Sequence, residues 1–117
     1  MIELIFIYNA KSGIGNAFID WAHKIISPKT YDCNLCSITY NNFKEIKWKE
    51  FLNNINAHSR FYYIDHLKEL DFVDEKTELP CVFINEKDEF KLIINSHEMN
   101  SFDNVDQLIS RLKVFLD

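Results

Sequence analysis

The sequence has little positive charge and no long apolar run, and both shortages exclude classes of protein. Thirteen Lys and Arg residues stand against 18 Asp and Glu residues, so the formal net charge is -5. Such a protein repels a phosphate backbone on average, which argues against nucleic-acid binding. The segment from Met1 to Ile7 has no basic leader, and its apolar run is too short for a signal peptide or a membrane span. We therefore expect a cytoplasmic protein that binds neither nucleic acid nor a membrane.

Two groups of catalytic motifs are also missing. The segment Lys11-Ser12-Gly13-Ile14-Gly15 follows the first apolar run but matches neither G-x-x-x-x-G-K-[ST] nor G-x-G-x-x-G. A GTPase or a dinucleotide-binding enzyme would therefore lack its phosphate cradle. His58, His66 and His97 stand in polar surroundings without a neighbouring Ser or Cys motif, so they form no recognisable catalytic triad.

The composition is that of an ordinary globular protein. The 117 residues have the length of one domain and include 47% hydrophobic and 15% aromatic residues, enough for a core that needs no disulfide or metal. The chain shows no internal repeat, low-complexity tract or linker. We expect a single domain over residues 1–117.

The hydrophobic pattern predicts alternating strands and helices. Residues 2–8 are apolar at both parities, which is typical of a central strand covered on both faces. A capped turn and an amphipathic helix follow, and Pro28 ends that helix. A second helix through Trp48 ends near residues 53–54. The remaining expected elements are a strand at 61–64, a short helix from Asp65 to Leu70, a hairpin of strands 80–84 and 90–94, and a last helix opened by Asp103 or Asn104.

Two of the three cysteines, Cys33 and Cys36, have C-x-x-C spacing. The residues 35–40 are compatible with a short strand, and a turn through residues 33–36 is equally compatible. In an extended strand the two Cα atoms would be roughly 10 Å apart, beyond the about 7 Å limit for a disulfide. Only a turn or a helical bend would let the two thiols bond each other or share a metal.

The order of the expected elements resembles the thioredoxin-like fold. The most specific local match is Leu79-Pro80-Cys81-Val82-Phe83-Ile84, because members of that family carry a cis-proline at the start of this strand. The resemblance implies an α/β three-layer sandwich, a central mixed sheet of four or five strands with helices on both faces. It also implies an insertion at about residues 28–57, after the first helix.

The chain also resembles a group of small uncharacterised bacterial proteins. The shared residues are Tyr8-Asn9-Ala10, His23-Lys24-Ile25, Ser27-Pro28 and Tyr31-x-Cys33-x-x-Cys36. This likeness implies membership of one family and brings no activity with it.

The cysteine positions depart from the thioredoxin pattern. Redox-active members have their C-x-x-C at the start of the first helix, where the helix dipole favours the thiolate. Here that loop, residues 9–13, contains no cysteine, so the ordinary mechanism is not carried over. Lys11 and Ser12 are candidate anion-binding residues at that loop, and Pro80 and Cys81 are expected to face it. In this layout Cys33 and Cys36 begin at the opposite end of the sheet.

Three interpretations of Cys33 and Cys36 remain open: buried structural thiols, a redox dithiol and a metal site. The weak metal candidates are Asp20, His23, Cys33 and Cys36, and their spacing matches no known zinc finger. Cys81 is either a nucleophile or a small hydrophobic core residue.

We therefore expect a thiol-disulfide redox protein that uses Cys33 and Cys36. The alternative is a non-catalytic binding or interaction module with structural or zinc-bound cysteines. In either case the partner, a protein or a small molecule, is unknown. We expect no cofactor, with zinc as the alternative.

Overall fold

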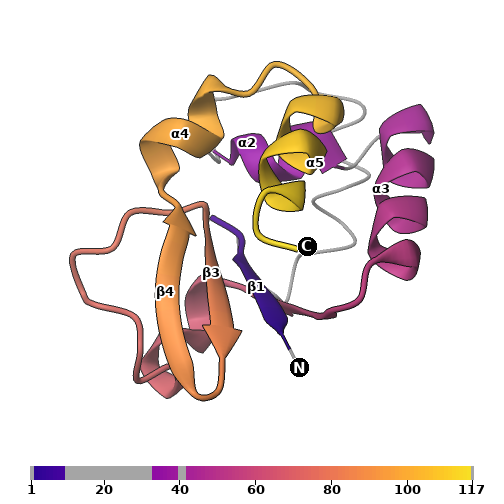
Figure 1. Cartoon of the computed structure of the whole chain (residues 1–117). Helices are drawn as coiled ribbons and strands as arrows, with labels where there is room; N and C mark the ends of the chain where they lie inside the picture. Colours follow the sequence, from indigo (N-terminus) through magenta and orange to yellow (C-terminus); the bar gives the residue numbers. More distant parts are fainter. Residues whose placement is uncertain (1, 10–32, 40–41, 117) are drawn as a thin grey trace.

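The computed structural model describes residues 2–9, 33–39 and 42–116, and for residues 42–45 it describes the backbone alone. Figure 1 shows a sheet whose β3-β4 hairpin lies on one side and whose helices gather mainly at one end. The described elements are β1 (Glu3–Ile7), α2 (Asn34–Thr39), α3 (Asn42–Asn54), β2 (His58–Tyr62), η2 (Ile64–Glu69), β3 (Cys81–Glu86), β4 (Glu89–Ile94), α4 (Ser96–Ser101) and α5 (Val105–Lys113).

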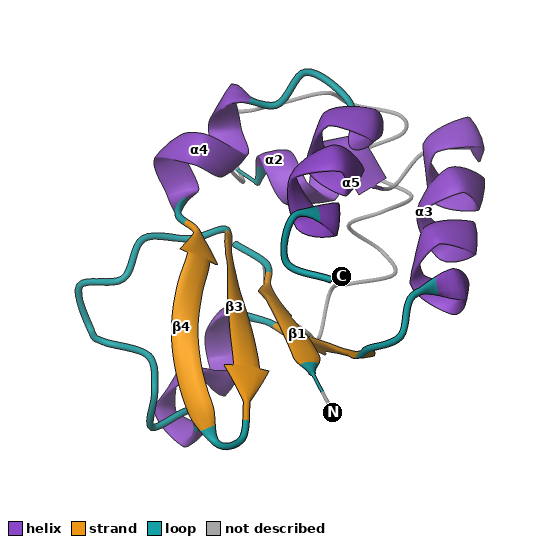
Figure 2. Cartoon of the chain, in the orientation of Figure 1, coloured by secondary structure: helices purple, strands orange, loops and turns teal. Residues whose placement is uncertain are grey.

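The four strands form one mixed sheet in the order β2-β1-β3-β4 (Figure 2). β1 runs parallel to β2 and antiparallel to β3, and β4 pairs antiparallel with β3. The mixed α/β class and the central position of β1 confirm those two expectations. The amphipathic helix that we expected before Pro28 lies outside the described residues, which omit residues 10–32.

Side chains of β1 alternate between two cores because successive residues of a strand point to opposite faces. Leu4, Phe6 and Tyr8 belong to a large core together with residues of α2, α3, α4 and α5. Ile5 and Ile7 belong to a small core with Leu67, which lies on η2, and with the loop that follows η2. Helical segments therefore pack against both faces of the described sheet.

The second strand begins earlier than its apolar residues suggest. We predicted residues 61–64, whereas β2 spans His58–Tyr62. Parallel pairing with β1 places His58 opposite Glu3 and Tyr62 opposite Ile7, so the pairing partner decides the strand's bounds. β2 lies at an edge of the sheet, where exposed polar residues such as Arg60 are tolerated.

The hairpin is confirmed, with a tighter turn than expected. β3 ends at Glu86 and β4 begins at Glu89, so only two residues connect them. Lys87 and Asp88 have φ values of 55° and 66°. The two-residue turn that matches the twist of a hairpin requires positive φ at both of its central residues. The peptide bond between Leu79 and Pro80, just before β3, is cis, the isomer that the resemblance implies.

Two helices near the carboxyl end differ in how well the sequence predicts them. α5 begins after Asn104, whose side chain accepts a hydrogen bond from the Gln107 N–H at 3.0 Å, as an N-cap residue does. α4 is absent from our predictions. Its sequence is polar apart from Met99, which is fully buried in the large core. An N-cap, in which the Asn95 side chain accepts from the Glu98 N–H at 2.8 Å, and the packing of Met99 stabilise this short helix, which has no apolar periodicity.

The segment that contains the C-x-x-C is helical. Residues 34–39 form α2, so the strand interpretation of residues 35–40 is wrong and the bent alternative is confirmed. Leu35 and Ile38 are buried in the large core. Three-residue spacing puts them on one helical face, and burial of that face favours a helix over a strand. α2 and α3 form the described part of the segment 28–57 that we expected as an insertion.

Candidate functional site

Cys33 and Cys36 are joined by a disulfide across the first turn of α2. Their Cα atoms are 5.3 Å apart, within the range that a disulfide requires. The two residues are only 6% and 5% exposed, and both belong to the large core. The structure thus brings together the two residues that the sequence singled out first.

Backbone groups of α2 hold the sulfur of Cys33. The Cys36 N–H donates to Cys33 Sγ at 3.3 Å, and the Ser37 N–H donates to the Cys33 carbonyl at 3.1 Å. Cys33 therefore occupies the position just before the helix, where a side-chain acceptor satisfies a free N–H of the first turn.

Asn34, between the two cysteines, fastens this turn to α4. Its Nδ2 donates to the Met99 carbonyl at 2.7 Å and to the Phe102 carbonyl at 2.9 Å. Phe102 is the residue at which α4 ends. One amide group thus donates to two carbonyls at the carboxyl end of α4, of which the Met99 carbonyl also accepts from the Phe102 N–H at 3.3 Å.

The disulfide lies at the same end of the sheet as Pro80. α4 begins two residues after β4 ends, and pairing places Ile94 of β4 and Ile7 of β1 beside the first residues of β3. α2 contacts α4 through Asn34, and Figure 1 shows the two helices beside each other beyond this end. Our placement of Cys33 at the opposite end is wrong, because contact with α4 draws α2 to this end.

Cys81 is separated from the disulfide by the sheet. It is fully buried in the small core, whereas Cys33 and Cys36 belong to the large core. Burial raises the pKa of the Cys81 thiol to about 12. Because the thiolate is the nucleophile in thiol chemistry, this environment favours the core-residue interpretation over the nucleophile.

Four of the predicted site residues lie outside the described residues. They are Lys11, Ser12, Asp20 and His23. Within the part of the chain that the structure describes, no group of three or more His, Cys, Asp or Glu side chains is placed to hold a metal ion. The zinc alternative stays a hypothesis. Pro80 is buried at the start of β3, next to Cys81.

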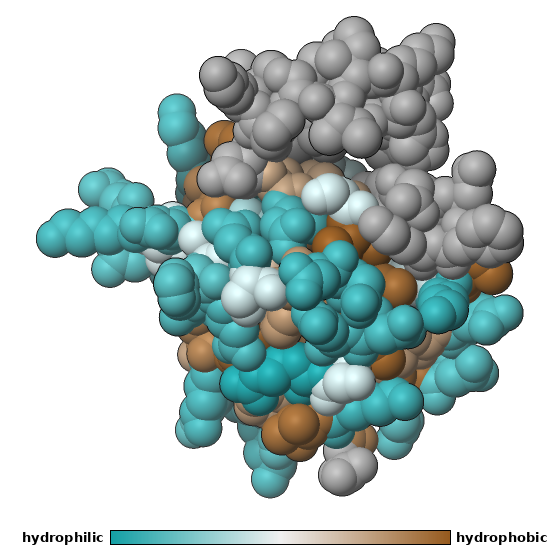
Figure 3. All heavy atoms as spheres, turned by 90° about the horizontal axis from the view of Figure 1, so that it is seen from above, coloured by the Kyte–Doolittle hydropathy of each residue, from teal (hydrophilic) through white to brown (hydrophobic). Residues whose placement is uncertain are grey.

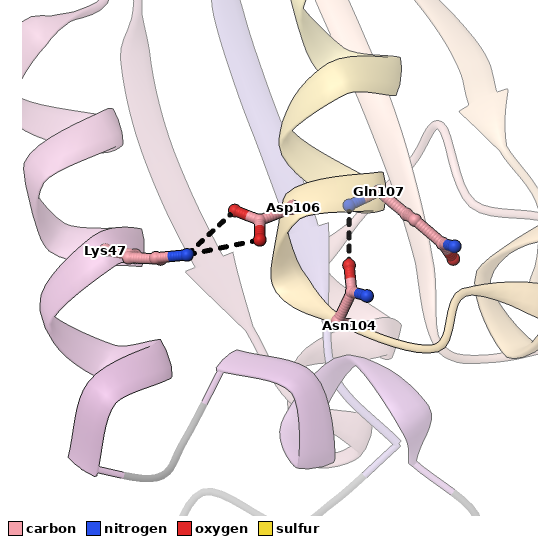
Figure 4. A network of polar contacts seen from close by, with 4 residues as sticks. All are labelled: Lys47, Asn104, Asp106 and Gln107. Carbon is pink, nitrogen blue, oxygen red and sulfur yellow. Dashed lines mark hydrogen bonds and ion pairs between the residues drawn. The ribbon is translucent and has the colours of Figure 1, made fainter.

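A groove separates α3 from α5. It has a volume of about 640 Å³, and its lining combines apolar residues with polar ones such as Glu50 and Lys113; the apolar residues are Phe51, Ile55, Ile109 and Leu116. Lys47 on α3 spans the groove to Asp106 on α5, with 3.2 Å between Nζ and Oδ2 (Figure 4). Both side chains are more than half exposed, so this ion pair contributes little stability and leaves the groove accessible.

The surface above α4 and α5 is mainly polar. Seen from that end of the molecule, the described surface is largely hydrophilic, with small and scattered hydrophobic areas (Figure 3).

The carboxylate of Glu3 forms hydrogen bonds at the other end of the sheet, where β1 begins. Glu3 accepts from Asn85 Nδ2 at 2.8 Å and from Arg60 Nε at 2.6 Å, so it connects β1 with both neighbouring strands. The hydrogen bond from Asn85, and then the Arg60 guanidinium, lower the pKa of Glu3 below its ordinary value of 4.5. This network is far from the cysteines and has a structural role.

No family model, curated protein or solved structure matches the chain. In the described residues no helix has both the length and the apolar character needed to cross a bilayer.

Sequence reasoning found the two cysteines of the site but missed Asn34 and its partners. The sequence does contain a signal for α2, because the apolar residues Leu35 and Ile38 have the three-residue spacing of one helical face. The partners, Met99 and Phe102, are 65 and 68 residues away in a helix that the sequence does not predict. No local pattern reveals a contact of that kind.

Proposed function

We propose that this protein is a thioredoxin-like thiol-disulfide redox protein whose dithiol is Cys33 and Cys36. The geometry of Cys33 and Cys36 is the main support for this proposal. One helical turn holds the two Cα atoms 5.3 Å apart and aims the Cys36 N–H at Cys33 Sγ. Cys33 directly precedes α2, and Cys36 lies in its first turn. The disulfide therefore opens and closes within one short segment, without rearranging the strands of the sheet.

We infer the two roles from the hydrogen bond to Cys33 Sγ, since an N–H donor stabilises a sulfur atom on which negative charge develops. Cys33, as a thiolate, attacks one sulfur of a substrate disulfide, forms a mixed disulfide and expels one substrate thiolate, which takes up a proton. Cys36, as a thiolate, then attacks Cys33 Sγ and expels the second substrate thiolate. Two electrons pass from the dithiol to the substrate, and the Cys33–Cys36 disulfide is the product.

The fold supports the thioredoxin-like part of the proposal at the level of element order. A parallel pair of strands precedes an antiparallel hairpin in one mixed sheet, Pro80 stands directly before β3, and a helix follows the hairpin. Helical segments lie on both faces. The family's usual cysteine position after β1 is taken by Asn9 to Gly13, so the dithiol of α2 replaces it in this proposal.

The small exposed fractions of the cysteines favour small substrates. At 6% and 5% exposure, the sulfur atoms are hard for a folded protein disulfide to reach. Low-molecular-weight disulfides are small enough to reach these sulfur atoms more easily. In the cytoplasm that the sequence predicts, the dithiol is the resting form and a disulfide oxidant closes it.

A thiol titration under defined redox conditions tests the proposal. The protein is equilibrated with mixtures of reduced and oxidised glutathione, trapped with acid, and the number of free thiols is counted by mass spectrometry after alkylation. We expect two thiols to titrate together while Cys81 stays reduced. The matched control is Cys81→Ala, which should leave the titration unchanged. Failure of the Cys33–Cys36 disulfide to form under mild oxidant refutes the redox function.

A second candidate is a non-catalytic binding module with structural cysteines. The groove between α3 and α5 favours it, since its lining combines apolar and polar side chains, as ligand sites do. This function predicts that the Cys33→Ala/Cys36→Ala double variant stays folded and that the protein does not reduce the disulfides of insulin. Rapid reduction of insulin by the wild-type protein would contradict it.

A further inference from the structure

We propose that Asn34 is a positioning residue that couples the oxidation state of Cys33 and Cys36 to the carboxyl end of α4. The inference rests on the proposed redox function and deepens it, because it names a route by which the state of the dithiol reaches another element. Asn34 touches no substrate in this scheme. It acts through the backbone that carries the two cysteines.

The contact is specific in its geometry. Both donated hydrogen bonds of Asn34 Nδ2 go to carbonyls at the carboxyl end of α4: at 2.7 Å to Met99, in its last turn, and at 2.9 Å to Phe102, the residue after it. Such bonds are close to the optimal N–H···O distance. Asn34 is partly buried, so its amide is shielded from competing water. Losing the amide would remove two partly buried hydrogen bonds, which costs more than loss of an exposed one, although the Met99 carbonyl would still accept from the Phe102 N–H at 3.3 Å.

Asn34 lies within the turn that the disulfide closes and also contacts α4. Asn34 directly follows Cys33 and is the first residue of α2. The disulfide fixes residues 33–36 in a bent conformation, and Asn34 fixes the same turn against α4. When the disulfide opens, the sulfur atoms move apart and the turn gains freedom, so the hydrogen bonds to Met99 and Phe102 weaken.

Thermodynamic linkage gives the effect its direction. If the disulfide strengthens the contact between Asn34 and α4, the contact must strengthen the disulfide by the same factor. Removal of the Asn34 amide therefore makes the disulfide easier to reduce. We expect about a fivefold decrease in the equilibrium constant for disulfide formation, at the low end of couplings between sites. For a two-electron couple this is a rise of about 20 mV in potential.

The test compares three variants in glutathione redox buffers. Asn34→Ala removes the amide, and Asn34→Asp keeps the shape of the side chain but removes its donors. Asn104→Ala is the matched control, since it removes an asparagine hydrogen bond at the start of α5 without touching α2. We expect the first two variants to shift the redox equilibrium about fivefold and Asn104→Ala to leave it within about 1.5-fold.

A second measurement needs no variant. Hydrogen exchange of the wild-type protein is followed in its oxidised and reduced forms at the Met99 and Phe102 amides, which donate to Asn95 and Met99 carbonyls. Coupling predicts faster exchange of these amides in the reduced form, whereas the amides of β1 and β3 keep their rates. This measurement decides the question even if the Asn34 variants do not fold.

The outcomes separate this inference from the function on which it rests. If the wild-type dithiol does not form a disulfide, the proposed redox function fails. If the disulfide forms but Asn34→Ala behaves like Asn104→Ala, the function stands and the coupling role of Asn34 is overturned. Equal exchange of the α4 amides in both forms overturns it as well.

Discussion

Reduction of the Cys33–Cys36 disulfide should lower the stability of the protein by a small and calculable amount. The bond closes a loop with a sequence separation of only 3. Loop-closure entropy grows with the logarithm of loop length, and for four residues it gives about 2 kcal/mol at 25 °C. For a domain of this size, 1 kcal/mol corresponds to a shift in melting temperature of about 4 °C. We therefore expect a decrease of about 8 °C.

Urea unfolding measures this difference directly. The transition is followed by the fluorescence of the two tryptophans, with and without a strong reductant, and the free energy of unfolding is extrapolated to water. The control is the Cys33→Ala/Cys36→Ala double variant, whose transition should not respond to the reductant. A loss above about 4 kcal/mol would refute the reasoning, because it would mean that the bond holds native packing as well as limiting the unfolded chain. A loss near zero would show that the folded protein does not contain the bond.

Further predictions concern the two cores and the charged contacts. Glu3→Gln removes a carboxyl whose pKa is lowered in the folded protein, so the wild type should lose stability relative to this variant as pH falls below 4.5, measured by urea unfolding across that range. Leu108→Ala should cost about 3 kcal/mol in free energy of unfolding, because Leu108 is fully buried in the large core. Lys47→Ala should change that free energy by less than about 0.5 kcal/mol, because its ion pair with Asp106 is mostly exposed. Cys81 should resist alkylation at neutral pH until the protein unfolds, since burial raises its pKa to about 12.

Each of these predictions has an outcome that contradicts it. The hydrogen-bond account of Glu3 is wrong if Glu3→Gln and wild type keep a constant stability difference down to low pH. A cost below about 1 kcal/mol for Leu108→Ala would mean that the large core refills the cavity. A large cost for Lys47→Ala would give the groove between α3 and α5 a structural role. Native-state labelling of Cys81 at the rate of a free thiol would show that the small core opens readily.

Hydrophobic periodicity was sufficient to predict the elements whose buried residues follow the regular spacing of a strand or a helix. The apolar residues of β1 at both parities predicted a strand with a core on each face, and Leu4 and Ile5 indeed belong to different cores. The Asn104 cap and the spacing of Val105, Leu108 and Leu112 predicted α5. In these cases the local signal and the tertiary environment favour the same conformation.

The failures occur where a distant partner decides a local conformation. The strand interpretation of residues 35–40 failed because the large core buries Leu35 and Ile38, which lie on one helical face. β2 starts at His58 because Glu3 lies opposite it across the parallel pair. α4 was missed because its one buried apolar side chain, Met99, gives no periodic pattern.

By itself, the sequence determined the α/β class, the central place of β1, the β3-β4 hairpin and the choice of Cys33 and Cys36 as the residues of interest. Composition and local periodicity contain that information, because each depends on neighbours within a few residues. The tertiary structure decided that residues 33–36 bend, that Cys81 belongs to a separate core, and that Asn34 joins the dithiol to α4. These features depend on packing between segments up to 68 residues apart, which no local pattern encodes.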